Sequence, residues 1–137
     1  MSRKSARAAC LQLAYEALYG GTGDQDTLVG LCGFPSDSPE DLDYIRSVQE
    51  GLKAHSEEID RIIESHLKGW TLERLSKVTW AALRIGVYEL MWCDDVPDGV
   101  AIQAAVELVQ RFDEEGQGHF VNGVLRSVLT DKQNAEG

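Results

Sequence analysis

The chain has 137 residues and a formal net charge of −10 at pH 7, with 13 Lys and Arg against 23 Asp and Glu. This length suits one domain with its own core, so we expect residues 1–137 to form a single domain with a frayed polar tail at 131–137. The negative charge excludes a general nucleic-acid binder, because a surface that follows phosphates along its whole length must be basic.

The first predicted helix covers about residues 3–19 and ends at the glycines of 20–23, which favour a turn. Its apolar residues recur at spacings of three and four, so they share one face. They are Ala6, Cys10, Leu13 and Ala17.

Capping residues mark the start of the next helix. Ser38 can accept a hydrogen bond from the backbone amides that a helix start leaves free, and Pro39 fits the first helical position. Apolar residues continue at helical spacing to Leu67, and Gly69 ends the stretch. The preceding residues 20–38 carry most of the loop signals in the chain.

A further helix start is predicted at Thr71, which would be the N-cap. Trp70 and Leu75 occupy the two positions of a hydrophobic staple around it. The stretch from Val78 to Met91 is apolar on nearly all sides, which places it at the centre of a domain.

Arg84 interrupts that apolar stretch. A buried guanidinium must be paired with a carboxylate or with the carbonyl end of a helix. We therefore expect Arg84 to have a structural role, with a carboxylate such as Glu89 or Glu107 as its partner.

Two more helices complete the prediction, one ending at about residue 113 and one covering about 120–129. Gly123 lies inside the second of these, where it costs helix stability unless packing needs a small residue. No segment shows the alternation of a β-strand. We expect an all-α fold of six or seven helices.

No motif in the sequence indicates catalysis, a cofactor or a bound metal. The glycine-rich segments 20–23 and 30–33 lack the Gly-Lys-Ser/Thr of a phosphate loop. His55, His66 and His119 lack the spacing of metal ligands, so we interpret His55 and His66 as surface residues. Adjacent carboxylates do not face each other on a helix. We expect no catalytic residue, no metal and no cofactor.

The cysteines and the hydropathy indicate the compartment. Cys10, Cys32 and Cys93 are an odd number without a Cys-x-x-Cys pair, which argues against a disulfide framework and a zinc site. Each has apolar neighbours, which is typical of an inert buried thiol. No stretch reaches the about 18 apolar residues of a membrane span. We expect a cytoplasmic protein without a membrane partner.

The charge is unevenly placed. Three basic residues against one acidic residue give residues 1–19 a net charge of +2, and residues 20–137 carry −12. Arg3 and Arg7 are four residues apart and share a helix face with Lys4 beside them. Arginine suits phosphates and aromatic rings suit unstacked bases, so this helix is a candidate RNA site. The alternative is an ordinary solvated helix start.

Four blocks of the sequence resemble the NusB family of transcription antitermination factors. They occur in the family's order and cover most of the chain outside residues 20–69. Together they are specific, although no single block is decisive. The blocks are SARAACLQLAY at 5–15, LRIGVYEL at 83–90, the apolar pattern of 96–108 with Val-Pro at its start, and FVNGVL at 120–125.

The resemblance implies an all-helical fold of two small bundles packed together. It also implies binding of boxA-type single-stranded RNA together with a small-subunit ribosomal protein. This pair would join an RNA polymerase antitermination complex, especially on ribosomal RNA operons, without catalysis. The RNA contacts of the family carry over to Arg3, Lys4, Arg7, Gln12, Tyr15, His119 and Phe120.

Two of these contacts have particular features in this chain. His119 stands where the family commonly has lysine, which weakens a positive contact at neutral pH. Phe120 lies on an apolar stripe with Val124, so the alternative is that its ring belongs to the core.

The chain also departs from the family at the expected partner interface. Thr79 and Trp80 replace an acidic and a basic residue, and Gln103-Ala104 replaces Asn-Glu. The acidic position has been linked to the ribosomal-protein interface, so Thr79 alters that contact. Trp80 is either a core residue or an aromatic of a partner or self-association surface. The alternative function is therefore a protein-interaction module or homodimer with weak or no RNA binding.

Overall fold

The computed structural model describes residues 3–18 and 39–136 of the chain. The predicted all-helical class is confirmed, since this part of the chain contains no strand. It holds five α-helices and one short 3-10 helix, compared with the six or seven helices expected. The predicted cap Ser38 and the glycines of 20–23 lie outside the described residues. The elements are α1 (Arg3–Leu18), α3 (Pro39–Ser65), η1 (Leu72–Arg74), α4 (Lys77–Trp92), α5 (Asp98–Phe112) and α6 (Gln117–Glu136).

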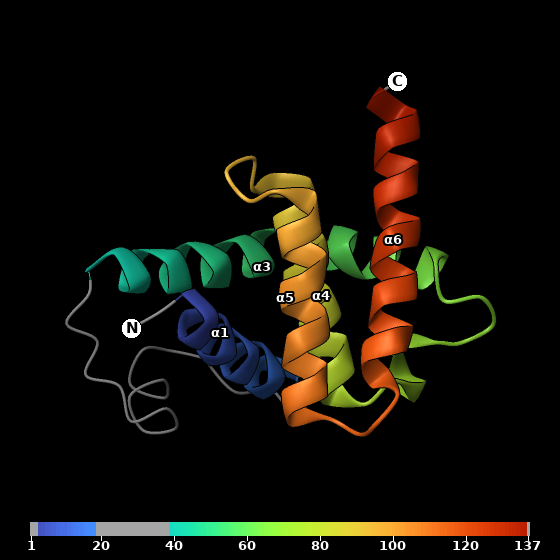
Figure 1. Cartoon of the computed structure of the whole chain (residues 1–137), viewed down its shortest axis with the longest axis horizontal. Helices are drawn as coiled ribbons and strands as arrows, with labels where there is room; N and C mark the ends of the chain where they lie inside the picture. The colour runs from blue at the N-terminus through green and yellow to red at the C-terminus, as the bar shows by residue number, and fades with distance from the viewer. Residues whose placement is uncertain (1–2, 19–38, 137) are drawn as a thin grey trace.

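Helix α4 is the centre of the fold, as its apolar sequence predicts. It contacts α1, α3, α5 and α6. Figure 1 shows α5 and α6 side by side, α1 at the opposite side of the molecule, and α3 running across behind α5. Ten of the sixteen residues of α4 are buried, because a helix without a polar face must be covered all round. No described helix is long and apolar enough to span a membrane.

The predicted helix start at Thr71 is confirmed in position, since Thr71 is the N-cap residue of η1. However, η1 is a short 3-10 helix, and the Thr71 side chain makes no cap hydrogen bond. Trp70 is half-exposed beneath the guanidinium of Arg74, which lies 5.2 Å from its ring centre. The N-cap of α4 is Ser76, whose hydroxyl accepts a 3.1 Å hydrogen bond from the backbone N–H of Thr79. Serine at this place satisfies one of the free amides of the first turn.

The predicted partners of Arg84 are wrong. Its guanidinium donates to both carboxylate oxygens of Asp60 on α3, at 2.9 and 2.6 Å. The indole N–H of Trp80 donates to the same carboxylate at 2.9 Å. Trp80 is partly buried and packs against the core. Asp60 therefore joins α3 to α4 through two side chains.

Helix α6 continues to Glu136, although a frayed tail was expected from residue 131. The ammonium of Lys132 donates to the backbone carbonyl of Leu90 at 2.7 Å and lies 3.1 Å from Asp98. One lysine thus satisfies a carbonyl in the last turn of α4 and a carboxylate in the first turn of α5. These contacts hold the last turns of α6 against the bundle.

Two glycines inside helices allow a matched test of packing. At Gly51 of α3 an added methyl group would overlap the ring of Tyr88, whereas at Gly123 of α6 it would meet nothing within 4 Å. Packing therefore does not require the glycine at 123. We expect Gly51→Ala to lower the free energy of unfolding by about 1–3 kcal/mol. Gly123→Ala should raise it by about 0.5–1 kcal/mol, because alanine has the higher helix propensity.

Urea denaturation of both variants measures the difference. Equal effects of the two substitutions would contradict this description of the helix packing.

Candidate nucleic-acid interface

Arg7 of α1 points into the molecule. It is 8% exposed, and its guanidinium donates to both carboxylate oxygens of Glu89 on α4, each at 2.9 Å. Glu89 is 1% exposed. This geometry is the two-fold pairing that suits an arginine and a carboxylate. The prediction that Arg7 lies on the RNA-binding surface is corrected accordingly, because its charge is used inside the protein.

Tyr44 of α3 completes this contact. Its hydroxyl donates to Glu89 at 3.2 Å, and the Arg7 guanidinium lies 5.9 Å from its ring centre. Burial first of all raises the pKa of Tyr44, and the negative charge of Glu89 adds to the effect. Burial by itself would lower the pKa of Arg7, but the hydrogen bonds and charge of Glu89 outweigh it and raise that pKa. The three side chains fix α1 against both α3 and α4.

The other predicted residues of α1 lie along the same helix. Arg3 and Lys4 belong to its first turn. Gln12 is half-buried, and Tyr15 is 39% exposed. The anchored helix therefore presents one aromatic side chain to solvent, two turns beyond Arg7.

The start of α6 holds the second group of predicted residues. His119 is exposed, whereas Phe120 is half-buried and packs against the core. Phe120 therefore serves the core in part, as its apolar stripe suggested. Gly118 is buried, and an added methyl group there would lie 2.8 Å from the Gln110 side chain of α5. This close approach holds the first turn of α6 on the last turn of α5.

A cluster of polar side chains also fixes the junction between α5 and α6. The hydroxyl of Thr79 lies 2.7 Å from Asp113 Oδ2 and 2.9 Å from Gln117 Oε1. Asp113 also accepts a hydrogen bond from the hydroxyl of Ser76. Thr79 is fully buried, so the prediction that it contacts a partner is corrected. Its hydroxyl instead positions the turn between α5 and α6, which leads to His119.

The carboxylate of Asp113 is held in its charged form. Partial burial by itself would raise the pKa of Asp113, but hydrogen bonds from Ser76, Thr79 and the Glu114 amide outweigh it and lower that pKa. Asp113 is also the residue that caps the C-terminus of α5. Its charge thus stabilises the α5–α6 junction at neutral pH.

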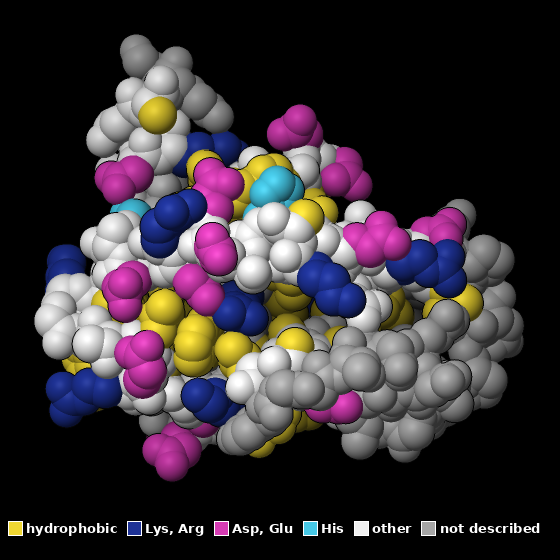
Figure 2. Space-filling model, turned by 180° about the vertical axis from the view of Figure 1, so that it is seen from behind, with side chains coloured by type: hydrophobic (Ala, Val, Ile, Leu, Met, Phe, Trp, Pro, Cys, Tyr) yellow, Lys and Arg dark blue, Asp and Glu magenta, His cyan; other side chains and the backbone are white. Residues whose placement is uncertain are grey.

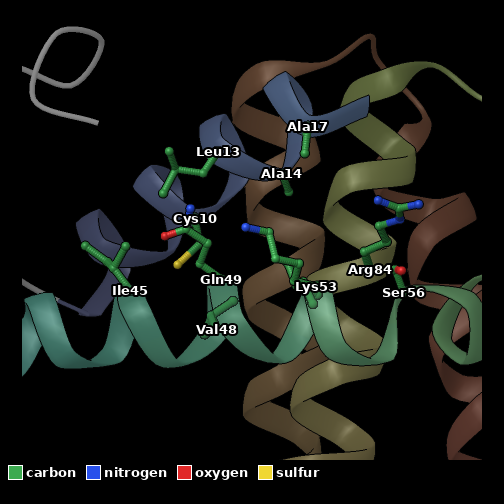
Figure 3. A pocket seen from close by; sticks show the side chains of 11 residues that line it. Cys10, Leu13, Ala14, Ala17, Ile45, Val48, Gln49, Lys53, Ser56 and Arg84 are labelled. Atoms are coloured by element: carbon green, nitrogen blue, oxygen red, sulfur yellow. The ribbon is translucent and has the colours of Figure 1, made fainter. Parts of the chain in front are cut away.

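An apolar groove of about 190 Å³ lies between α1 and α3, apart from the predicted RNA contacts. Figure 3 shows Leu13 and Ala14 of α1 facing Val48 of α3, with Lys53 and Arg84 toward one end. None of the predicted site residues lines it. Its walls are the facing sides of α1 and α3, which Arg7 and Tyr44 both connect to Glu89 of α4.

The charges on the back of the molecule are mixed. Figure 2 shows acidic and basic side chains interspersed around a furrow of apolar side chains. An interspersed surface of this kind lacks the basic field that a long nucleic acid needs. This face therefore agrees with the exclusion of a general nucleic-acid binder.

His55 and His66, interpreted as surface residues, are half-buried. His55 stacks on Trp92 with ring centres 4.4 Å apart, and His66 Nε2 lies 2.7 Å from Asp131.

Burial raises the pKa of Cys93 to about 11, which leaves its thiol protonated and unreactive at neutral pH. The described residues contain no group of three or more side chains that could hold a metal ion.

The sequence reading missed Glu89 as the partner of Arg7. A signal for it exists, since Glu89 is the acidic residue inside the apolar stretch of 78–91 and Arg7 lies among alanines. Two isolated opposite charges on apolar helices must each find a partner, or their burial is too costly. Arg84 is five residues before Glu89 on the same helix and so faces another direction. Identifying Arg7 as the partner requires the crossing of α1 and α4, which periodicity does not supply.

The chain is similar to known proteins over most of its length. The sequence pattern of the NusB family matches residues 4–130. A transcription antitermination protein NusB from Finegoldia magna is 34% identical over 135 residues, which cover 98% of both chains. One from Saccharopolyspora erythraea is 42% identical over 125 residues, covering 90% of this chain and 84% of that protein.

The fold is also similar to solved structures. A NusB-type chain in the crystal structure of the antitermination factors NusB and NusE in complex with dsRNA is 31% identical, with a TM-score of 0.83. The match covers 94% of this chain and 96% of that chain. It therefore includes the helices that carry both groups of predicted contacts.

The buried pair allows a double-mutant test. Glu89→Leu alone should lower the free energy of unfolding by about 3–5 kcal/mol, because it leaves the Arg7 guanidinium buried without a partner. The double variant Arg7→Met with Glu89→Leu should recover most of that loss, since two apolar side chains replace two charges. Urea denaturation of the two single variants and the double variant gives the coupling. Strict additivity of the two single losses would contradict the pairing.

The lowered pKa of Asp113 makes its contribution depend on pH. A carboxylate whose pKa is lower in the folded than in the unfolded state stabilises the fold above about pH 4, and the effect is lost as pH falls through the folded value. Asp113→Asn should therefore cost about 1–2 kcal/mol at pH 7 and much less at pH 2.5. Chemical denaturation at both pH values measures this, and a loss that is the same at both would refute it.

Proposed function

The chain belongs to the NusB family, and from this premise we propose that it is a non-catalytic RNA-binding factor of transcription antitermination. In this proposal it binds boxA-type single-stranded RNA together with a small-subunit ribosomal protein. The pair acts in the cytoplasm within an RNA polymerase antitermination complex, especially on ribosomal RNA operons. No cofactor takes part.

One observation carries the proposal. The helices α1 and α6 expose Tyr15 and His119 in a fold that matches, over 94% of the chain, the fold of a factor seen with NusE and dsRNA. An exposed aromatic ring offers a stacking face to an unpaired base. The first turn of α1 adds Arg3 and Lys4 as contacts to phosphates.

The charge of the chain limits how tightly it binds RNA by itself. Arg7 is committed to Glu89, which leaves the first turn of α1 with two cations in a chain of net charge −10. Counterion release from few phosphates gives modest affinity. The ribosomal protein then supplies much of the binding by adding its own contacts to a composite surface.

The alternative is a protein-interaction or self-association module, including a homodimer. Thr79 and Trp80 motivated it, but Thr79 is buried and the Trp80 indole is held by Asp60. The half-exposed Trp70 is the remaining feature in its favour. Sedimentation of the free protein and of Trp70→Ala distinguishes the two functions, since a dimer that Trp70→Ala dissociates supports the alternative.

The direct test is a titration of a labelled boxA-type RNA with the chain, with and without the ribosomal protein, at two salt concentrations. The proposal expects weak binding by the chain alone and tighter binding by the pair. Absence of RNA binding in both mixtures would overturn it.

Two residues of the site should respond in opposite directions. Tyr15→Ala should lose about 1–3 kcal/mol of RNA binding, because one stacking face disappears, whereas Tyr15→Phe keeps the ring and most of the affinity. His119→Lys should raise the affinity and steepen the logarithmic salt dependence by about 0.7, through one added phosphate contact.

Fluorescence anisotropy with the same RNA measures both effects, and His119→Gln is the neutral control. A salt dependence that is identical for His119→Lys and His119→Gln would remove His119 from the site.

A further inference from the structure

The last turn of α5 carries a basic residue beside an exposed aromatic ring. Arg111 is the only Lys or Arg among the residues of α5, Asp98–Phe112. Its side chain is exposed, and its guanidinium carbon lies 4.7 Å from the ring centre of Phe112. Phe112 is itself 39% exposed. A cation over an aromatic ring at this distance is held in place without losing its charge.

This turn lies between the two groups of predicted RNA contacts. On the side of α1, Arg111 lines a small hollow together with Arg7, and Ala104, Glu107 and Leu108 of α5 form the rest of its wall. On the side of α6, the neighbouring Gln110 packs against Gly118, one residue before His119. Figure 1 shows that α5 and α6 meet at this end of the molecule. A strand of RNA that contacts α1 and the start of α6 would therefore pass the end of α5.

The charge of Arg111 is available for a ligand. Arg7 and Arg84 are each paired with a buried or half-buried carboxylate, but no salt bridge joins Arg111 to a carboxylate within residues 3–18 and 39–136. Glu107, one turn earlier on α5, accepts a 3.3 Å hydrogen bond from Gln103. The following turn is acidic at Glu114 and Glu115, which would repel a phosphate, and Arg111 is the basic residue of α5 next to that turn.

We propose that Arg111, supported by the ring of Phe112, binds a phosphate of the RNA where the strand passes from α1 to α6. The inference rests on the proposed RNA-binding function and adds α5 to its surface. Guanidinium groups bind phosphate through parallel hydrogen bonds, and such contacts fix the register of a strand without reading its bases. The other role for a basic residue in a last helical turn is to stabilise the carbonyl end of the helix. These two roles differ in their effect on salt dependence.

The test compares Arg111→Gln with Arg61→Gln, which removes the same charge from an exposed arginine of α3. The probe is a labelled boxA-type single-stranded RNA, titrated with the full chain and the ribosomal protein between 50 and 200 mM salt. Loss of one phosphate contact should weaken binding about fivefold near 0.1 M salt and reduce the logarithmic salt dependence by about 0.7. Arg61→Gln should leave both quantities unchanged.

Arg111→Lys keeps the charge but not the paired donors, so it should restore the salt dependence with only part of the affinity. Thermal unfolding of each variant checks that the fold is intact. If the wild-type chain binds RNA and Arg111→Gln behaves like Arg61→Gln, this inference fails while the proposed function stands. If the wild-type chain with the ribosomal protein binds no RNA, the proposed function fails and the inference fails with it.

Discussion

The buried contact between Arg7 and Glu89 determines how the first helix sits on the rest of the protein. It joins α1 to α4 by two hydrogen bonds of 2.9 Å, and Tyr44 brings α3 to the same carboxylate. Burying two charges is tolerable only when their geometry is good and their remaining groups are satisfied. The pair therefore fixes α1, which carries Tyr15 of the proposed RNA surface, against α3 and α4.

The same interaction explains the weak basic character of the proposed RNA surface. A chain with a net charge of −10 uses its most central arginines, Arg7 and Arg84, inside the fold. The cations that we place on the proposed RNA surface are few, namely Arg3, Lys4 and Arg111. The α5–α6 junction, set by Asp113 and Thr79, leads to the exposed His119. A short site completed by a ribosomal protein follows from this distribution of charge.

Periodicity was sufficient for the helical class and for the central place of 78–91, because burial of apolar faces decides both. It was insufficient for the ion pairs, since the crossings of α1 and α3 with α4 bring Arg7 to Glu89 and Asp60 to Arg84. The helix starts after residue 70 were predicted in part. Thr71 precedes only the short 3-10 helix η1, whereas the long apolar helix α4 begins after Ser76, whose hydroxyl accepts the cap hydrogen bond.

The most direct test of this account is the salt dependence of RNA binding by the chain without its partner. Three cations, Arg3, Lys4 and Arg111, each giving about −0.7, predict a slope of about −2 for the logarithm of affinity against the logarithm of salt concentration. A slope near −2 with measurable binding agrees with a short site at one end of the molecule. A slope of about −5 or steeper, or no binding at any salt concentration, would contradict it.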